Sequence, residues 1–275
     1  MLRYSTQKPC EALSDYVRFF WTLEASVGSM EPFVHRALPD NCLELIFYCQ
    51  GRFSISSSTG AEGNTFTSGV FGHAQKYRQF TTNSDFTLFG VYLYPHSFKM
   101  LFDLPANELT DAMVNCETLW GAEGRILEEK VMLAPDNARR VEIVSTFLLD
   151  RIKRTESSHF GFMFLVKKII ANNTLISIPS FASDCNLSRR QLERKFKEFS
   201  GFSPKDFFRL VRFKNVLKES EHPNKSLAQI AIDSGYYDQA HFNHEFKKYS
   251  GYSPREFFIN CPEATDTRVT RDFKT

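Results

Sequence analysis

An internal repeat near the C-terminal end constrains the fold of this chain more than any other feature of its 275 residues. Leu192–Phe208 and Phe242–Phe258 align at a constant offset of 50 residues, with 8 identities in 17 positions. The identical pairs are Phe196/Phe246, Lys197/Lys247, Ser200/Ser250, Gly201/Gly251, Ser203/Ser253, Pro204/Pro254, Phe207/Phe257 and Phe208/Phe258. Similarity at a fixed period indicates that one structural unit has been duplicated.

Each copy carries start and stop signals for a helix followed by a second helix. Ser188 with Gln191 three residues later forms a capping box, and Asp238 is the N-cap candidate of the second copy. Gly201 and Gly251 predict a left-handed C-terminal end, and the Ser-Pro pair after each glycine predicts a new cap with proline in the first turn. Each helix has one apolar face, at positions i, i+4 and i+7: Leu192, Phe196 and Phe199, and Phe242, Phe246 and Tyr249.

A shorter helix is expected upstream of each of these, over Ile178–Asp184 and Leu227–Ser234. Ala182 and Ala231 allow two helices to approach closely where they cross. Asn186 and Gly235 can adopt the positive φ of a tight turn between helices. The sequence therefore predicts two helix-turn-helix units.

With these residues the chain resembles the AraC/XylS family of transcription regulators, whose DNA-binding domain holds two such units joined by a helix. The resemblance covers about a hundred residues and is closest over Ala231–Phe257, A-x3-G-Y-x-D-x3-F-x3-F-K-K-x2-G-Y-S-P-x2-F. It implies a connecting helix over Pro204–Lys218, where Asn215 departs from the small apolar residue usual in the family. The N-terminal half more loosely resembles a subset of such regulators, through L-P-D-x-C-x-E-L-I-F at Leu38–Phe47 and L-T-D…L-W-G over Leu109–Gly121.

The predicted fold class is α+β, with a β-rich N-terminal domain followed by an all-α domain. Strands are expected over Tyr16–Leu23, Leu43–Cys49 and Phe86–Tyr94, and helices over Ser97–Phe102, Leu119–Leu133 and Asp136–Arg154. We expect residues 1–157 to form a sensor or dimerisation domain, a barrel or sandwich that is cupin-like by analogy with the family, with helices at its end. Residues 158–260 are expected to form the DNA-binding domain, with units at about 175–200 and 226–250 and the connecting helix at about 204–218, and residues 261–275 are expected to form a flexible tail.

The last helix of the N-terminal part has one apolar stripe, formed by Val141, Val144, Phe147, Leu148 and Ile152. Such a stripe must be buried, either against the β-rich domain or in a homodimer contact. Both alternatives remain open from the sequence.

Charge is distributed unevenly along the chain, although its net charge is only +2. Residues 159–260 carry 16 Lys and Arg against 10 Asp and Glu, whereas residues 1–158 carry 15 against 19. A cationic domain suits double-stranded DNA. The base-contacting candidates on the polar helix faces are Arg189, Arg190, Glu193, Arg194, Gln239, Ala240, Asn243 and His244. The phosphate-contacting candidates are Lys197, Lys205, Arg209, Lys247, Lys248 and Arg255.

Other functions receive less support from the sequence. His35, His73 and His96 are spread out, without metal-ligand spacing or a catalytic motif, so no metal, cofactor or enzyme activity is expected; an enzyme with a cupin-like catalytic domain is the alternative. The N-terminal domain either binds a small-molecule effector, or only self-associates or contacts RNA polymerase. The aromatic residues Phe71, Tyr77, Phe80, Phe89, Tyr92 and Tyr94 are candidates for lining a pocket, although aromatics at strand spacing are more often simple core residues. Scattered cysteines and the lack of a long apolar run predict a cytoplasmic protein without a membrane segment.

Overall fold

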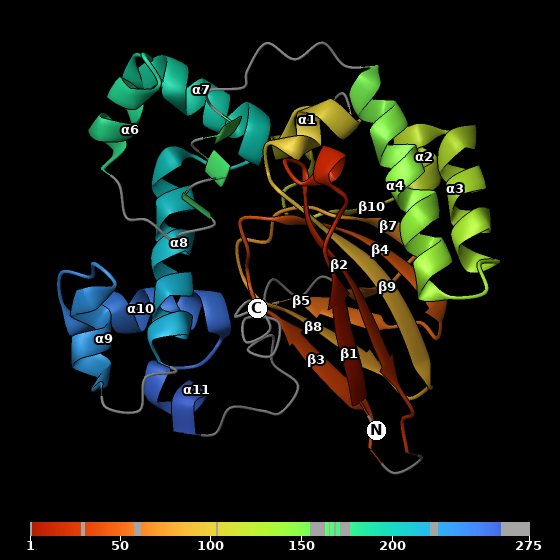
Figure 1. Cartoon of the computed structure of the whole chain (residues 1–275). Coiled ribbons are helices and arrows are strands. Elements are labelled where there is room, and N and C mark those ends of the chain that lie inside the picture. The colour runs from red at the N-terminus through yellow and green to blue at the C-terminus, as the bar shows by residue number, and fades with distance from the viewer. Residues whose placement is uncertain are drawn as a thin grey trace.

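The computed structural model describes residues 2–28, 31–57, 62–102, 104–154, 163–164, 166–167, 169–170, 177–220 and 225–259. The domain boundary predicted at residues 157–158 and the tail predicted over residues 261–275 lie outside these ranges. In Figure 1 a β-sandwich with covering helices occupies one side of the molecule, and the C-terminal helices occupy the other.

The N-terminal part is a sandwich of two antiparallel sheets. The larger sheet has the strand order β1-β2-β9-β4-β7-β10, with bounds β1 Leu2–Gln7, β2 Val17–Ala25, β4 Leu43–Gln50, β7 Ser68–Phe71, β9 Phe86–Leu93 and β10 Met113–Asn115. The smaller sheet has the order β3-β8-β5-β6, with bounds β3 Phe33–Ala37, β5 Ser54–Ser57, β6 Glu62–Asn64 and β8 Arg78–Thr82. The prediction of a barrel or sandwich is thus resolved in favour of a sandwich.

The two faces of the larger sheet bury different sets of side chains. On β4, Leu43, Leu45 and Phe47 join a cluster with the covering helices, whereas Ile46 and Tyr48 point between the sheets. This alternation follows from the two-residue period of a strand. The strand is apolar on both faces because both faces are covered.

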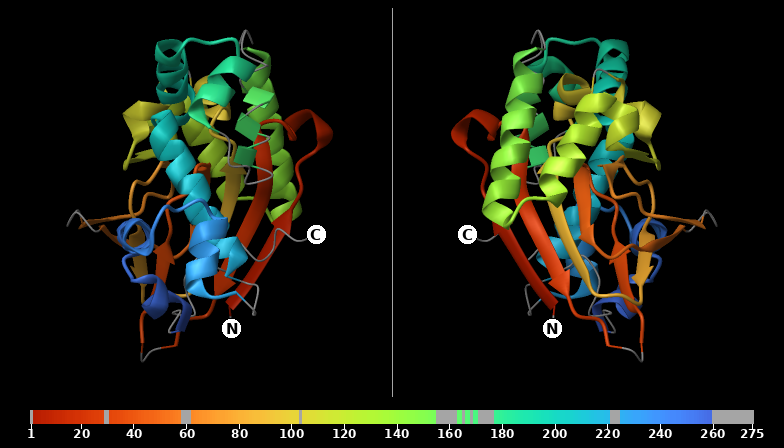
Figure 2. Two further views of the ribbon diagram at one scale, coloured as in Figure 1. Left: turned by 90° about the vertical axis from the view of Figure 1, so that its left-hand side faces the viewer. Right: turned by 90° about the vertical axis from the view of Figure 1, so that its right-hand side faces the viewer.

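Helices cover the outer face of the larger sheet, as the right-hand view of Figure 2 shows. They are η1 Glu11–Leu13, α1 Ser97–Phe102, η2 Ala106–Leu109, α2 Cys116–Trp120, α3 Ala122–Met132 and α4 Asn137–Lys153. The single helix predicted over Leu119–Leu133 is wrong, because Gly121 adopts φ 60° and separates α2 from α3. The break lets α3 fold back onto α2, where a Cβ on Gly124 would lie only 1.9 Å from Cys116 O.

The apolar stripe of α4 packs on the β-rich domain. Val144 and Leu148 are fully buried, and Val141, Phe147 and Ile152 lie partly buried against the same cluster. Of the two alternatives for this stripe, the structure shows burial within the chain.

The C-terminal region is all helical. Its helices are α6 Ile178–Asp184, α7 Arg189–Ser200, α8 Pro204–Glu219, α9 Leu227–Asp233, α10 Gln239–Ser250 and α11 Pro254–Ile259. In Figure 1, α8 runs between the pair α6–α7 and the pair α9–α10. Phe196, Phe213 and Phe246 are completely buried in the core that holds these helices together.

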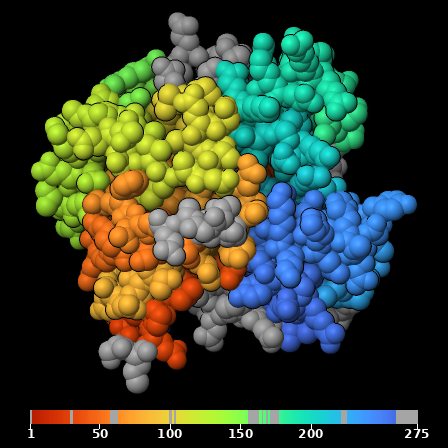
Figure 3. All heavy atoms as spheres, turned by 180° about the vertical axis from the view of Figure 1, so that it is seen from behind, coloured from red at the N-terminus to blue at the C-terminus, as the bar shows by residue number. Residues whose placement is uncertain are grey.

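The C-terminal helices lie directly against the sandwich, and Figure 3 shows the two parts in contact along their boundary. The side chains between the sheets and those of the C-terminal helices form one continuous apolar cluster. At this boundary the His73 and Phe202 rings lie 4.7 Å apart. Arg36 of β3 donates to Ser250 O at 3.1 Å and stacks between Tyr77 and Tyr252.

Candidate nucleic-acid interface

The ends of α7 and α10 are fixed by the residues that the repeat analysis singled out. Ser188 Oγ accepts a bond from Gln191 N at 3.3 Å, and Ser188 N donates to Gln191 Oε1 at 2.9 Å, which completes the capping box. Asp238 Oδ1 accepts from His241 N at 2.7 Å. Gly201 and Gly251 end the helices at φ 72° and 83°. The local sequence therefore determines where both helices begin and end.

The turns before these helices are closed by equivalent hydrogen bonds. Leu187 N donates to Ala182 O at 2.9 Å, and Tyr236 N donates to Ala231 O at 3.0 Å. Each turn uses one left-handed residue, Asn186 at φ 53° and Gly235 at φ 80°. Both units thus have the helix-turn-helix geometry that the sequence predicts.

The first helix-turn-helix unit presents a polar, mostly cationic face to solvent. All five candidates on α7 are exposed: Arg189, Arg190, Glu193, Arg194 and Lys197. Leu192, Phe196 and Phe199 are buried on the opposite face. Arg189 Nε lies 3.3 Å from Glu193 Oε1, so these two side chains neutralise each other in the free protein, whereas Arg190 and Arg194 have no ion pair among the described residues. Cations on one helix face are suited to both phosphates and guanine edges.

The second unit presents a polar face that carries less charge. On α10, Gln239, Ala240, Asn243, His244 and Lys247 are all exposed. Phe242, Phe246 and Tyr249 are buried. Amide side chains suit an adenine edge, so the two faces differ in the bases that they can contact.

The phosphate-contacting candidates do not share one environment. Lys197, Lys205, Lys247 and Arg255 are exposed, and Lys248 is half-buried with its ammonium 5.3 Å from the centre of the Tyr249 ring. Arg209 instead lies in an internal ion-pair network: its guanidinium is 3.4 Å from Asp206 Oδ1 and 3.4 Å from Glu245 Oε2. It is therefore not a freely presented cation, and its position favours a structural role.

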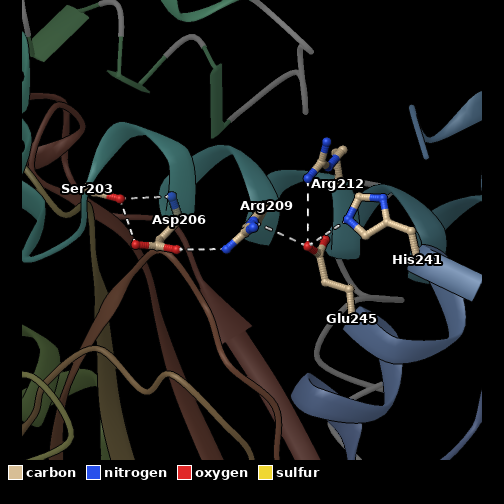
Figure 4. A network of polar contacts seen from close by, with 6 residues as sticks. All are labelled: Ser203, Asp206, Arg209, Arg212, His241 and Glu245. Atoms are coloured by element: carbon tan, nitrogen blue, oxygen red, sulfur yellow. Dashed lines mark hydrogen bonds and ion pairs between the residues drawn. The ribbon is translucent and has the colours of Figure 1, made fainter. Parts of the chain in front are cut away.

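This network joins α8 to the second unit (Figure 4). Glu245 on α10 is only 5% exposed, and its Oε2 lies 3.7 Å from Arg212 Nη2 and 3.5 Å from His241 Nε2. Burial, followed by the charge of Glu245, raises the pKa of Tyr236 well above its usual range. The Arg212 guanidinium also lies 5.3 Å over the Tyr236 ring. The network fixes the orientation of α10 relative to the connecting helix.

The repeat contained a signal for two features that the sequence predictions missed. The position of Glu245 is occupied by Lys195 in the first copy, so the buried acid belongs to the second unit alone. The second turn is also one residue longer, since the left-handed residues are 49 apart and the helix caps 50 apart. The additional residue is Tyr237, which is 94% exposed beside the start of α10.

A cavity of about 210 Å³ lies between the two sheets. Of the six aromatic residues proposed for a pocket, Phe71, Phe80 and Tyr92 line it. Phe89 is buried on the opposite face of the sheet. Tyr77 stacks on Arg36, and Tyr94 stacks on His96. The cavity is mainly apolar, as small-molecule sites usually are.

One wall of the cavity is connected to the helix between the two units. Asp40, in the segment between β3 and β4, is ion-paired with Lys214 of α8 and accepts from Tyr92 Oη at 2.9 Å. Burial alone would raise the pKa of Asp40, but Lys214 and Arg18 hold it well below its usual range. Next to it, Asn41 Nδ2 donates to Phe207 O at 3.4 Å. The β3–β4 segment thus contacts both the cavity and the connecting helix α8.

Comparison with known proteins matches the two parts of the chain separately. Residues 5–115 match the family "Domain of unknown function (DUF6597)", and residues 181–259 match the family "Helix-turn-helix domain". The Msm operon regulatory protein of Streptococcus mutans is 31% identical over 103 residues, which are 37% of this chain and 37% of that protein. The chain thus matches little more than a third of the length of this curated relative.

The solved structures that the chain matches are distant from it in sequence. Wild-type ToxT of Vibrio cholerae, solved with an unsaturated fatty acid, is 12% identical with a TM-score of 0.48, covering 87% of this chain and 95% of that one. An AraC-type transcriptional regulator from Chromobacterium violaceum is 25% identical with a TM-score of 0.32, covering 35% of this chain and 88% of that one. In the described part of the chain, none of the helices has the length and apolar content needed to cross a bilayer. The chain thus carries an AraC-type helix-turn-helix domain in its C-terminal part, after a domain of unknown function.

Proposed function

We propose that the protein regulates transcription by binding a specific DNA sequence with α7 and α10. The observation that carries the proposal is the duplication of one scaffold whose polar face is exposed in both copies. Helices held in this way fit into successive major grooves, so one chain would cover about two helical turns of duplex. A transcription regulator of this kind is expected in the cytoplasm.

The proposal assigns base contacts to both units and phosphate contacts around them. In the first unit, Arg190 and Arg194 suit guanine and Glu193 suits cytosine, with Arg189 at the flank. In the second unit, Asn243 and Gln239 suit adenine, with Ala240 and His244 beside them. The phosphate set is Lys197, Lys205, Lys247, Lys248 and Arg255; Arg209 is left out because of its ion pairs with Asp206 and Glu245.

The test is a selection of bound fragments from genomic DNA, followed by affinity measurements on the selected sequence. Arg194→Ala and Asn243→Ala should each cost about 1–3 kcal/mol and relax the preference at different positions of the site. Lys247→Ala should weaken binding to all DNA sequences by a similar factor. It should also reduce the slope of the logarithm of affinity against the logarithm of salt concentration by about 1. Arg125→Ala is the matched control, because Arg125 is an exposed cation on α3 of the N-terminal part. An unchanged sequence preference in both base-contact variants would contradict the assignment.

We further propose that the N-terminal domain controls this activity by binding a small molecule between its sheets. The cavity and its connection to α8 through Asp40 and Lys214 support control by an effector over a domain that only self-associates. Comparing DNA affinity with and without a fractionated extract of small metabolites tests this part. DNA affinity that is the same with every fraction would favour the effector-independent alternative.

A further inference from the structure

The cavity between the sheets contains buried hydrogen-bond donors that have no acceptor. Arg78 of β8 is 9% exposed and Trp21 of β2 is 8% exposed, and both line the cavity. Neither Arg78 Nη2 nor Trp21 Nε1 makes a hydrogen bond to any described residue. Buried donors are almost always paired in folded proteins, so two in one cavity call for an acceptor from outside the chain.

Arg78 is the stronger of the two indications, because its unpaired donor carries charge. The nearest carboxylate is Asp111, whose Oδ1 is 3.8 Å from Nη2, too far for a hydrogen bond. Asp111 is half-exposed, and Oδ1 already accepts from Gln75 N at 2.9 Å. Burial lowers the pKa of the Arg78 guanidinium, which nevertheless stays protonated at neutral pH. A buried guanidinium with so little compensation is a site for an anion.

The two carboxylates that line the cavity, Asp40 and Glu44, do not supply the missing acceptor for Arg78 Nη2. Asp40 is neutralised by Lys214 and also accepts from Cys42 N at 3.0 Å. Glu44 lines the same cavity and could favour a cation instead, so a cationic ligand has to be one arm of the test.

The other residues that line the cavity determine which shape and chemical character the uncharged part of the ligand can have. Trp21 is held in place because its indole ring lies against Gly90, where a Cβ would come within 2.2 Å of the ring. Phe33, Phe53, Phe80 and Tyr92 supply further aromatic surface from both sheets. An apolar cavity of about 150 Å³ accepts benzene, so about 210 Å³ suits a single substituted ring. Aromatic walls favour a flat ring by stacking and edge contacts.

We infer that the cavity binds a small aromatic carboxylate, with the carboxylate on the Arg78 guanidinium and the ring among the aromatic side chains between the sheets. The inference rests on the proposed function, because it names the class of the effector that the proposal places in this cavity.

The experiment uses the full chain and three probes of the same shape: 3-phenylpropanoate, 3-phenylpropan-1-ol and 3-phenylpropylamine. Titration calorimetry without DNA should show the carboxylate binding most tightly. Arg78→Met should weaken carboxylate binding about tenfold or more, as expected for a lost charged hydrogen bond, and leave alcohol binding within about threefold. Retained alcohol binding also shows that the variant is folded. Arg3→Met is the matched control, since Arg3 is an exposed arginine of β1 outside the cavity lining.

Tighter binding of the amine, or no binding of the carboxylate to the wild-type chain, would overturn the inference without any variant. An equal carboxylate preference in wild type and Arg78→Met would also overturn it. DNA binding is measured on the same preparations. Carboxylate binding without DNA binding would refute the proposed function alone, and DNA binding without probe binding would refute this inference alone.

Discussion

His73 and Gly201 are in contact where the first helix-turn-helix unit packs against the sandwich. A Cβ on Gly201 would lie 2.7 Å from His73 Cδ2, so glycine serves both the left-handed helix end and this close contact. Burial lowers the pKa of His73 to about 3, and neither of its ring nitrogens has a hydrogen-bond partner among the described residues. The contact therefore requires the neutral imidazole.

A dependence of stability on acid follows from His73. The unfolded histidine has a pKa near 6.5, so as pH falls the unfolded chain takes up the proton first. The stabilisation is complete above about pH 6.5 and is lost progressively toward the folded pKa of about 3. His73→Phe should reduce the fall in the free energy of unfolding between pH 7 and pH 4.5 by on the order of 1 kcal/mol or more, measured by urea denaturation.

His96, whose pKa burial lowers to about 4, contributes in the same direction and keeps part of the slope in that variant. His244→Phe is the matched control, because His244 is exposed on α10 and the substitution is the same. If the free energy of unfolding of His73→Phe depended on pH as strongly as that of the wild type, the His73 imidazole would have to take up its proton in the folded state as well.

At the scale of the element, the two helix-turn-helix units have the same internal scaffold, but they are held to the connecting helix in different ways. The buried phenylalanines, the caps and the glycine stops are the same in both, whereas Glu245 ties only α10 to the connecting helix. Removing one partner of a buried charge cluster leaves the remaining charges uncompensated. The second unit should therefore depend on this single acid.

Glu245→Gln is expected to lower the free energy of unfolding by about 2 kcal/mol, because Arg209 and Arg212 lose the carboxylate while part of their charge stays solvated. Urea denaturation measures the loss. The control is Glu142→Gln, which removes an exposed pair with Arg139 and should change stability by about 0.5 kcal/mol or less. Equal effects of the two substitutions would assign Glu245 no structural role.

The elements that the sequence predicted best are those with local signals. The limits of α6 and α1, the capping box at Ser188 and the stops at Gly201 and Gly251 were confirmed, because each depends on residues a few positions apart. The break at Gly121 was missed, because one glycine inside a helical pattern does not reveal its own φ. Strand order and the Glu245 network could not be predicted, and only three of the six pocket candidates line the cavity, because these features join residues distant in the sequence.

At the scale of the whole molecule, the segment between β3 and β4 connects the sandwich with the C-terminal helices. Asp40 and Lys214 are 174 residues apart in the chain, and their side chains are only 16% and 15% exposed. A buried pair of this kind costs more to break on one side than to remove completely. It should therefore behave as one energetic unit across the boundary.

The expected outcome is strong coupling in a double-mutant cycle. Lys214→Met and Asp40→Asn should each destabilise the chain by about 2–4 kcal/mol, and the double variant by clearly less than their sum. Thermal unfolding of all four proteins gives the coupling energy. Single effects that add to within about 0.5 kcal/mol would mean that the pair does not hold the two parts together.

Under the proposed function, the difference between the outward faces of α7 and α10 has a consequence for the orientation of the protein on DNA. One face carries three arginines and a glutamate, and the other carries amides, a histidine and the protruding Tyr237. A protein whose two DNA-contacting helices carry different side chains can bind its site in only one orientation, because the reverse orientation would lose the contacts of both helices. Each bound molecule would thus have a fixed direction along the double helix, so the genes on its two sides would face different surfaces of the protein.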